Sequence, residues 1–178
     1  MKYVKLFFKK LLRFLLKPLS FIPALLVMYC IFMFSSQDGT ASGNLSYKVS
    51  KKIVVITDEV LKKNWNESQI SVNTDKIHYY VRKGAHITEY FILAVSISFP
   101  LYVYGVRSIW LILVAGTFCI GFAGLDEYHQ LFVSGRGSSK RDVYIDSIGV
   151  FSGIIITQFV CHIGRVTVFK PLSNKPKH

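Results

Sequence analysis

The sequence has few acidic residues and few cysteines, and both shortages narrow the class of protein. Its 10 Asp and Glu stand against 22 Lys and Arg, a formal net charge of +12, although 51% of the residues are hydrophobic. This combination is typical of a membrane protein with basic residues at the ends of its spans. Cys30, Cys119 and Cys161 lie in separate apolar runs without CxxC or CxxH spacing, which disfavours a disulfide framework and a zinc site.

The excess of basic residues does not indicate a nucleic-acid-binding protein. Lys and Arg are dispersed around the apolar runs and are not gathered on one soluble domain. We therefore expect membrane lipids, and not nucleic acid, to be partners of this chain.

Four apolar runs predict an all-α integral membrane protein. A transmembrane helix needs about 20 residues, at a rise of ~1.5 Å per residue, to cross the hydrocarbon core of a bilayer. Runs near this length occupy residues 19–35, 84–104, 109–125 and 143–163. Pro18 and Pro23 predict a kink at the start of the first run. We do not expect this run to be a cleaved signal peptide, because the basic region before it is long and no A-x-A site follows.

Two amphipathic helices are expected outside the spans. Residues 1–18 carry Lys or Arg at steps of three and four with apolar residues opposite, which predicts a helix on an anionic membrane surface. The long loop between the first two spans contains an apolar stripe at helical spacing. Its members are Leu45, Val49, Ile53, Ile56 and Val60. We expect this second helix either to rest on the outer bilayer surface or to cover the bundle as a solvated helix.

The N-terminal basic cluster sets the expected orientation. Such clusters stay in the cytoplasm, and four spans return the basic C-terminal tail, residues 164–178, to the same side. Lys and Arg divide evenly between the two sides in this topology, so the orientation depends on the N-terminal cluster. All 10 acids fall on the outer side or in the outer halves of spans. We expect a multi-pass protein of the plasma membrane with both termini in the cytoplasm.

Polar side chains gather where three of the spans reach the outer face. They lie in VRKGAHITEY at the second span, in DEYHQ at the third and in SGRGSSKRDVYIDSIG before the fourth. Because alternate spans run in opposite directions, topology places these three clusters at one depth. Helical spacing puts the members of a cluster on one face, and Gly149 and Gly153 favour close helix contact on the face that carries the acids of the fourth span.

These clusters supply the candidate site residues, because ionisable residues in membrane spans are costly and usually functional. Those expected to carry chemistry are His86, Glu89, Asp126, Glu127, Asp142 and Asp146. Those expected to bind a ligand are Arg82, Lys83, Tyr90, Gln130, Arg136 and Arg141. A histidine oriented by a carboxylate at i+3 exchanges protons near neutral pH, and arginines hold an anion such as a lipid-linked phosphate. A divalent metal ranks lower, since no HExxH-like spacing is present, and no cofactor is expected.

Other interpretations remain open beside catalysis. Each cluster alone also fits a structural role: a His86–Glu89 hydrogen bond, an interfacial helix end, or a flexible basic loop. Together they also fit an interhelical network that holds four helices in one arrangement, in a protein that binds a partner or a drug. Transport is disfavoured, because the polar stripe of the second span ends at Tyr90 and no polar path crosses the bilayer.

The segments RKGAHITEYFIL and DEYHQLFVSGRGSSKRDVYIDSIGVFSG resemble the VanZ-like family of small bacterial membrane proteins. IFMFSSQDGTASGNLSYKVS is similar to the N-terminal part of that family, so the likeness covers residues 31–153. The motifs K-x-x-H-x-x-E-Y, D-E-x-x-Q-x-F, G-R and D-x-x-x-D-x-x-G fall on Lys83, His86, Glu89, Tyr90, Asp126, Glu127, Gln130, Phe132, Gly135, Arg136, Asp142, Asp146 and Gly149. The resemblance implies a bacterial cell-envelope protein. The family's namesake is linked to low-level resistance to teicoplanin, a glycopeptide, which suggests a lipid-linked cell-wall precursor or a glycopeptide as ligand.

Overall fold

The computed structural model describes residues 17–169, and this part of the chain is helical with no strand. The elements are η1 (Pro18–Phe21), α2 (Ile22–Ser35), α3 (Gly39–Leu61), α4 (Glu67–Val103), α5 (Ile109–Gln130), α6 (Lys140–Gly164) and η2 (Arg165–Phe169). The all-α architecture predicted from the sequence is confirmed. Nearly all of the basic helix expected over residues 1–18, and residues 170–178 of the tail, lie outside the described residues.

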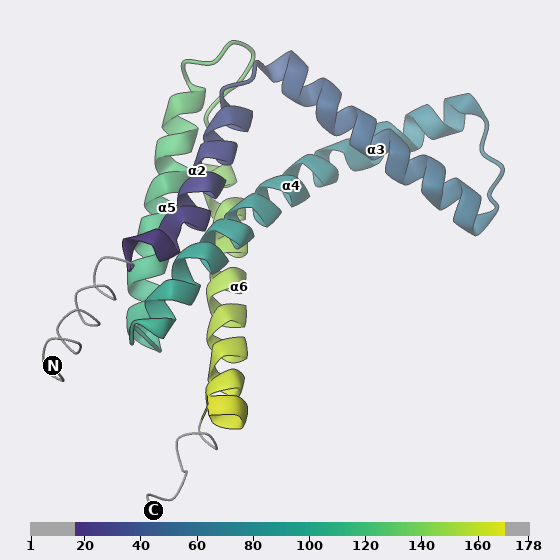
Figure 1. Cartoon of the computed structure of the whole chain (residues 1–178). Helices are drawn as coiled ribbons and strands as arrows, with labels where there is room; N and C mark the ends of the chain where they lie inside the picture. Colours follow the sequence, from purple (N-terminus) through teal and green to yellow (C-terminus); the bar gives the residue numbers. More distant parts are fainter. Residues whose placement is uncertain (1–16, 170–178) are drawn as a thin grey trace, which may run out of the picture.

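Four helices in the described part are long and apolar enough to cross a membrane, as the sequence predicts. They are Pro18–Ser35, Glu67–Val103, Ile109–Gln130 and Lys140–Thr167. The first starts with the 3-10 turn η1, and its α-helix begins only at Ile22, next to Pro23. Helix α4 packs against α6, and it runs obliquely to α5 and α6 (Figure 1).

Helix α4 is much longer than its apolar run. The predicted span begins at residue 84, whereas α4 starts at Glu67 and has 37 residues. A capping box starts the helix: the Asn66 side chain accepts from the Gln69 amide at 2.9 Å, and the Gln69 side chain accepts from the Asn66 amide at 3.0 Å. The polar first half of α4 packs against α3, and the two form an arm that projects from the bundle (Figure 1).

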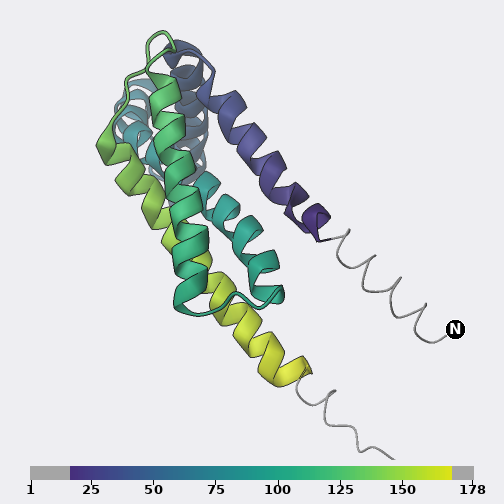
Figure 2. The ribbon, with the colours of Figure 1, turned by 90° about the vertical axis from the view of Figure 1, so that its left-hand side faces the viewer.

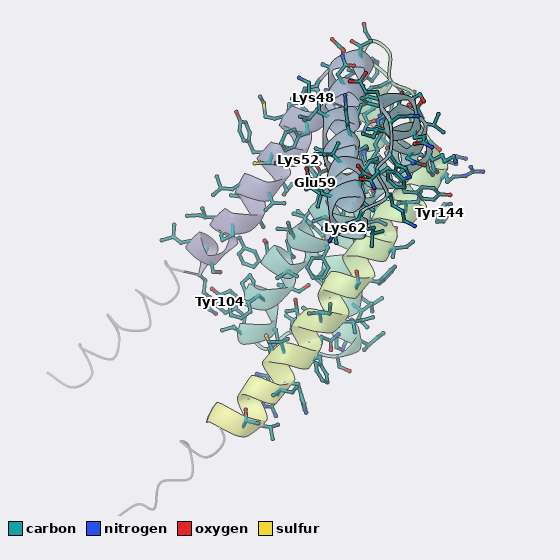
Figure 3. All side chains as sticks on the ribbon, turned by 90° about the vertical axis from the view of Figure 1, so that its right-hand side faces the viewer. Lys48, Lys52, Glu59, Lys62, Tyr104 and Tyr144 are labelled. Atoms are coloured by element: carbon teal, nitrogen blue, oxygen red, sulfur yellow. The ribbon has the colours of Figure 1, made fainter. Side chains whose placement is uncertain are left out.

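Helix α3 has the predicted amphipathic pattern, but its apolar stripe is not buried against the bundle. All five residues of the stripe are exposed, from 43% at Ile53 to 72% at Val60. The face toward α4 is instead formed around buried Ser50 and Val54, and Lys48, Lys52 and Glu59 are exposed beside the stripe (Figure 3). An exposed apolar stripe flanked by lysines is suited to contact with lipid.

The contact between α4 and α6 depends on two glycines. A Cβ on Gly149 would overlap the backbone carbonyl of Ile87, and a Cβ on Gly153 would lie 2.7 Å from the carbonyl oxygen of Phe91. This is the close helix approach that small-xxx-small spacing predicts. The contact fixes the rotation of α6, so that Asp146, one turn before Gly149, is buried at 1% exposure.

Candidate functional site

A pocket of about 200 Å³ opens where α4 and α5 meet the end of α2 and the start of α3. Its apolar lining comes mainly from α2 and α3, and consists of Ile31, Phe34, Leu45, Val49, Val81 and Ala85. Its ionisable lining consists of Arg82, His86, Glu89, Asp126 and Arg136. The three elements that carry these charged groups are α4, α5 and the loop after α5, so the pocket joins clusters far apart in sequence.

The charged residues of α4 enter the pocket because they share one helical face. Arg82, His86 and Glu89 follow steps of four and three, which place them in one stripe. The structure does not pair His86 with Glu89, so the expected orienting contact at i+3 is wrong. The His86 Nδ1 atom lies 3.8 Å from Asp146 Oδ1 instead, because the close α4–α6 packing brings Asp146 to this side. At 3.8 Å the two atoms are too far apart for a hydrogen bond.

Asp126 is only partly satisfied by its neighbours. It is 5% exposed, and its Oδ2 atom accepts from Gln130 Nε2 at 3.1 Å. Its Oδ1 atom has no hydrogen-bond partner among the described residues, and the same is true of the Ser35 hydroxyl, which also lines the pocket. The hydroxyl of fully buried Tyr90 and Asp146 Oδ1 are unpaired too. An unsatisfied buried polar atom costs about 1–3 kcal/mol, so Asp126 and Ser35, which line the pocket, are available to a ligand that supplies the partner.

Arg136 connects the loop after α5 to the end of α2. Its Nε atom donates to the Gln37 carbonyl at 2.8 Å, and its Nη2 atom donates to the Phe34 carbonyl at 2.7 Å. A cation is favourable here, because the last carbonyls of a helix carry the negative end of its dipole. The loop is fastened beside it by a hydrogen bond from the Gly39 amide to the Ser134 carbonyl at 3.0 Å.

Arg136 also lies in a dense field of charges. Burial lowers the pKa of its guanidinium and nearby Arg82 lowers it further, whereas the carboxylates of Asp126, Glu89 and Glu127 raise it. Two arginines and three carboxylates therefore lie within electrostatic range of one another at this end of the bundle. The arginines have free donor groups for an anion, since neither forms an ion pair at 4 Å or less within the described residues.

Several candidate residues do not line the pocket and instead fix the start of α6. Lys83 Nζ lies 2.6 Å from Asp142 Oδ2, an ion pair between α4 and α6. Glu127 Oε2 accepts from the Ser139 amide at 2.8 Å, and Ser139 caps α6 through its hydroxyl. The candidates outside the pocket lining are Lys83, Tyr90, Glu127, Gln130, Arg141, Asp142 and Asp146.

Sequence reasoning missed the contribution of the end of α2, the start of α3 and the turn that connects them. Ser35, Gln37, Ser42 and Ser46 line the pocket, and Leu45 and Val49 form part of its apolar wall. Two signals pointed to this region: the family resemblance of residues 31–50, and the α3 stripe, whose first two members reach the pocket. Within residues 17–169, no three His, Cys, Asp or Glu side chains are arranged to hold a metal ion together.

Four membrane-spanning helices with a polar pocket at one end define a polytopic membrane protein with a candidate ligand site. The family model VanZ/LLP1 matches residues 20–161, a range that contains every residue of the pocket. The chain belongs to the VanZ/LLP1 family, as its motifs predict. Searches of curated proteins and of solved structures found no match.

Proposed function

We propose that the pocket binds an anionic, lipid-linked or cell-envelope ligand at the outer face of the plasma membrane. The observation that carries this proposal is the composition of the pocket: Arg82 and Arg136 stand beside an apolar wall formed by Phe34, Leu45 and Val49. Guanidinium groups bind phosphate and carboxylate groups through paired hydrogen bonds. An apolar wall beside them fits the hydrocarbon part of a lipid.

The pocket also has groups suited to proton transfer. His86, Glu89 and Asp126 line it together with the two arginines, and a general acid or base must lie within hydrogen-bonding reach of its substrate. Binding is the basic activity in this proposal, and acid–base chemistry on the bound anion is its extension.

The family relationship suggests the biological setting. A lipid-linked cell-wall precursor has the charge and the hydrocarbon chain that the pocket fits, and it is presented at the outer leaflet. We propose a role in teicoplanin susceptibility for this reason. This role requires both termini to lie in the cytoplasm, because only then does the pocket face outward.

A second candidate is a non-enzymatic scaffold, and specific contacts favour it. The Lys83–Asp142 ion pair, the Glu127–Ser139 hydrogen bond and the bonds from Arg136 to α2 join four helices and one loop. In this alternative, the polar clusters hold the helices in one arrangement for binding of a partner or a drug.

Alanine substitution separates the two candidates. We expect His86→Ala, Glu89→Ala and Asp126→Ala to change teicoplanin susceptibility at normal membrane abundance, because these residues line the pocket and make few contacts between helices. Lys83→Ala is the control, since it breaks an ion pair away from the pocket and should lower abundance or thermal stability. Unchanged susceptibility in all three pocket variants would reject the proposed site, and a common loss of abundance would favour the scaffold.

A further inference from the structure

A second pocket lies at the opposite end of the bundle from the polar site. It has a volume of about 510 Å³ and is lined by the end of α4, the turn between α4 and α5, and the last turns of α6 with η2. Figure 2 shows the α4–α5 connection running close to α6 at this end. We call it the basal pocket, and none of the residues of the family motifs lines it.

The basal pocket carries positive charge that no acidic side chain offsets. Arg107, His162 and Arg165 line it, and neither arginine forms an ion pair within residues 17–169. Residues 90–125 and 147–178 contain no Asp or Glu, and neither do residues 1–37. Arg107 lies over the ring of Tyr102 at 5.1 Å, which holds the guanidinium in place but leaves its charge uncompensated.

The start of α5 adds to the positive character of this pocket. Ser108, a lining residue and the N-cap of α5, makes no capping hydrogen bond with its side chain. The first amides of a helix lack acceptors within the helix and carry the positive end of its dipole. Gln158 Nε2 donates to the Ser108 carbonyl at 3.3 Å and thereby joins this turn to α6.

The side of the pocket on α6 is apolar. Ile155 and Phe159 line it one helical turn apart, at 59% and 66% exposure, on a helix that crosses the membrane. This arrangement matches the two parts of a phospholipid: the two arginines suit the anionic headgroup, and the lipid-facing apolar wall suits the acyl chains. Basic pockets between transmembrane helices bind anionic headgroups in this way.

We propose that the basal pocket binds the phosphate headgroup of an anionic phospholipid, with its acyl chains along Ile155 and Phe159. The apolar wall favours a lipid over free phosphate, which has no hydrocarbon to bury there. This site is independent of the polar pocket, since the two share no residue.

Fluorescence quenching of Trp110 tests this site directly. The chain has two tryptophans, and Trp110 lies two residues after Ser108. Trp65→Phe leaves Trp110 as the single fluorophore, and the full chain with this substitution is reconstituted in phosphatidylcholine vesicles. The vesicles contain a fixed fraction of a lipid that is brominated near the headgroup, either phosphatidylglycerol or phosphatidylcholine. Brominated phosphatidylglycerol should quench Trp110 more strongly than brominated phosphatidylcholine. The double variant Arg107→Gln with Arg165→Gln should remove this difference in quenching. If each arginine contributes about 1 kcal/mol, the affinity for phosphatidylglycerol relative to phosphatidylcholine falls about fivefold for each arginine that is replaced.

Matched controls separate the pocket from general attraction of anionic lipid to a basic protein. Lys51→Gln with Lys52→Gln removes the same charge from exposed positions on α3 and should keep the preference, as should Arg107→Lys with Arg165→Lys. Equal quenching by the two lipids, or a preference that survives loss of both arginine charges, would overturn the proposal. If millimolar inorganic phosphate removed the preference, the ligand would be free phosphate and the lipid assignment would be wrong.

Discussion

Arg82 and Arg136 line the same pocket but differ in what else they contact. Arg136 donates to two carbonyls at the end of α2, whereas Arg82 makes no side-chain hydrogen bond or ion pair at 4 Å or less within the described residues. The first arginine is therefore fixed by the fold, and the second is free to move onto a ligand. At the scale of single residues, Arg136 combines support of the fold with a place in the pocket, whereas Arg82 is available for binding alone.

The two arginines give a matched pair of alanine variants. Arg136→Ala removes the charged donor to the carbonyls of Phe34 and Gln37, so we expect a loss of about 1–3 kcal/mol in stability and a lower melting temperature in detergent. Arg82→Ala should leave the melting temperature unchanged and weaken binding of an anionic ligand. An equal fall in melting temperature for both variants would contradict this division.

At the scale of elements, the α4–α6 contact determines which acids face the bundle. Gly149 touches the backbone of α4 closely enough that a methyl group would collide with the Ile87 carbonyl. That contact buries Asp146 and brings it near His86. The rotation of α6 is thus set by a glycine, and the electrostatic surroundings of His86 follow from it.

Glycine substitutions test this packing. Gly149→Ala should force α6 away from α4 and reduce stability by about 1–3 kcal/mol, the usual cost of overpacking, with a fall in membrane abundance. Gly121→Ala on α5 is the control, because a Cβ there has no neighbour within 4 Å. If the Gly149 variant had normal abundance, or if both variants lost the same amount, the α4–α6 contact at Gly149 would not determine stability.

Elements also differ in how far the sequence predicts them. The four spans were predictable because a bilayer demands about 20 apolar residues of any helix that crosses it, and the depth of the polar clusters follows from alternating direction. The first half of α4 could not be predicted in this way. Residues 67–83 are polar, and they are packed against α3 by a tertiary contact that the sequence does not reveal. The same holds for the pocket: Arg82, His86 and Glu89 follow from helical spacing, whereas the contribution of Ser35 and the pairing of His86 with Asp146 depend on how helices pack.

At the scale of the whole molecule, charge is divided between the two ends of the bundle. Acidic side chains are absent from residues 90–125 and 147–178, which include the lining of the basal pocket, and Glu89, Asp126 and Asp146 gather at the other end. The two proposed anion sites therefore differ in their surroundings: the polar pocket is mixed in charge, and the basal pocket has only basic side chains.

Cysteine labelling tests the proposed orientation. In intact cells, a membrane-impermeant maleimide should label Ser138→Cys in the loop between α5 and α6, because this loop belongs to the end of the bundle proposed to face outward. Thr167→Cys should react only after permeabilisation, and the unsubstituted chain reports the background from Cys30, Cys119 and Cys161. The reverse pattern would place the polar pocket on the cytoplasmic side.

The central claim, that Arg82 and Arg136 form part of a pocket for an anionic lipid-linked ligand, is tested most directly by mass spectrometry of the lipids that copurify with the protein. We predict an anionic lipid-linked species that is enriched with the wild-type chain and lost with Arg82→Ala, while Arg107→Gln with Arg165→Gln retains it. The same copurifying lipids in wild type and Arg82→Ala, at equal protein recovery, would contradict the account.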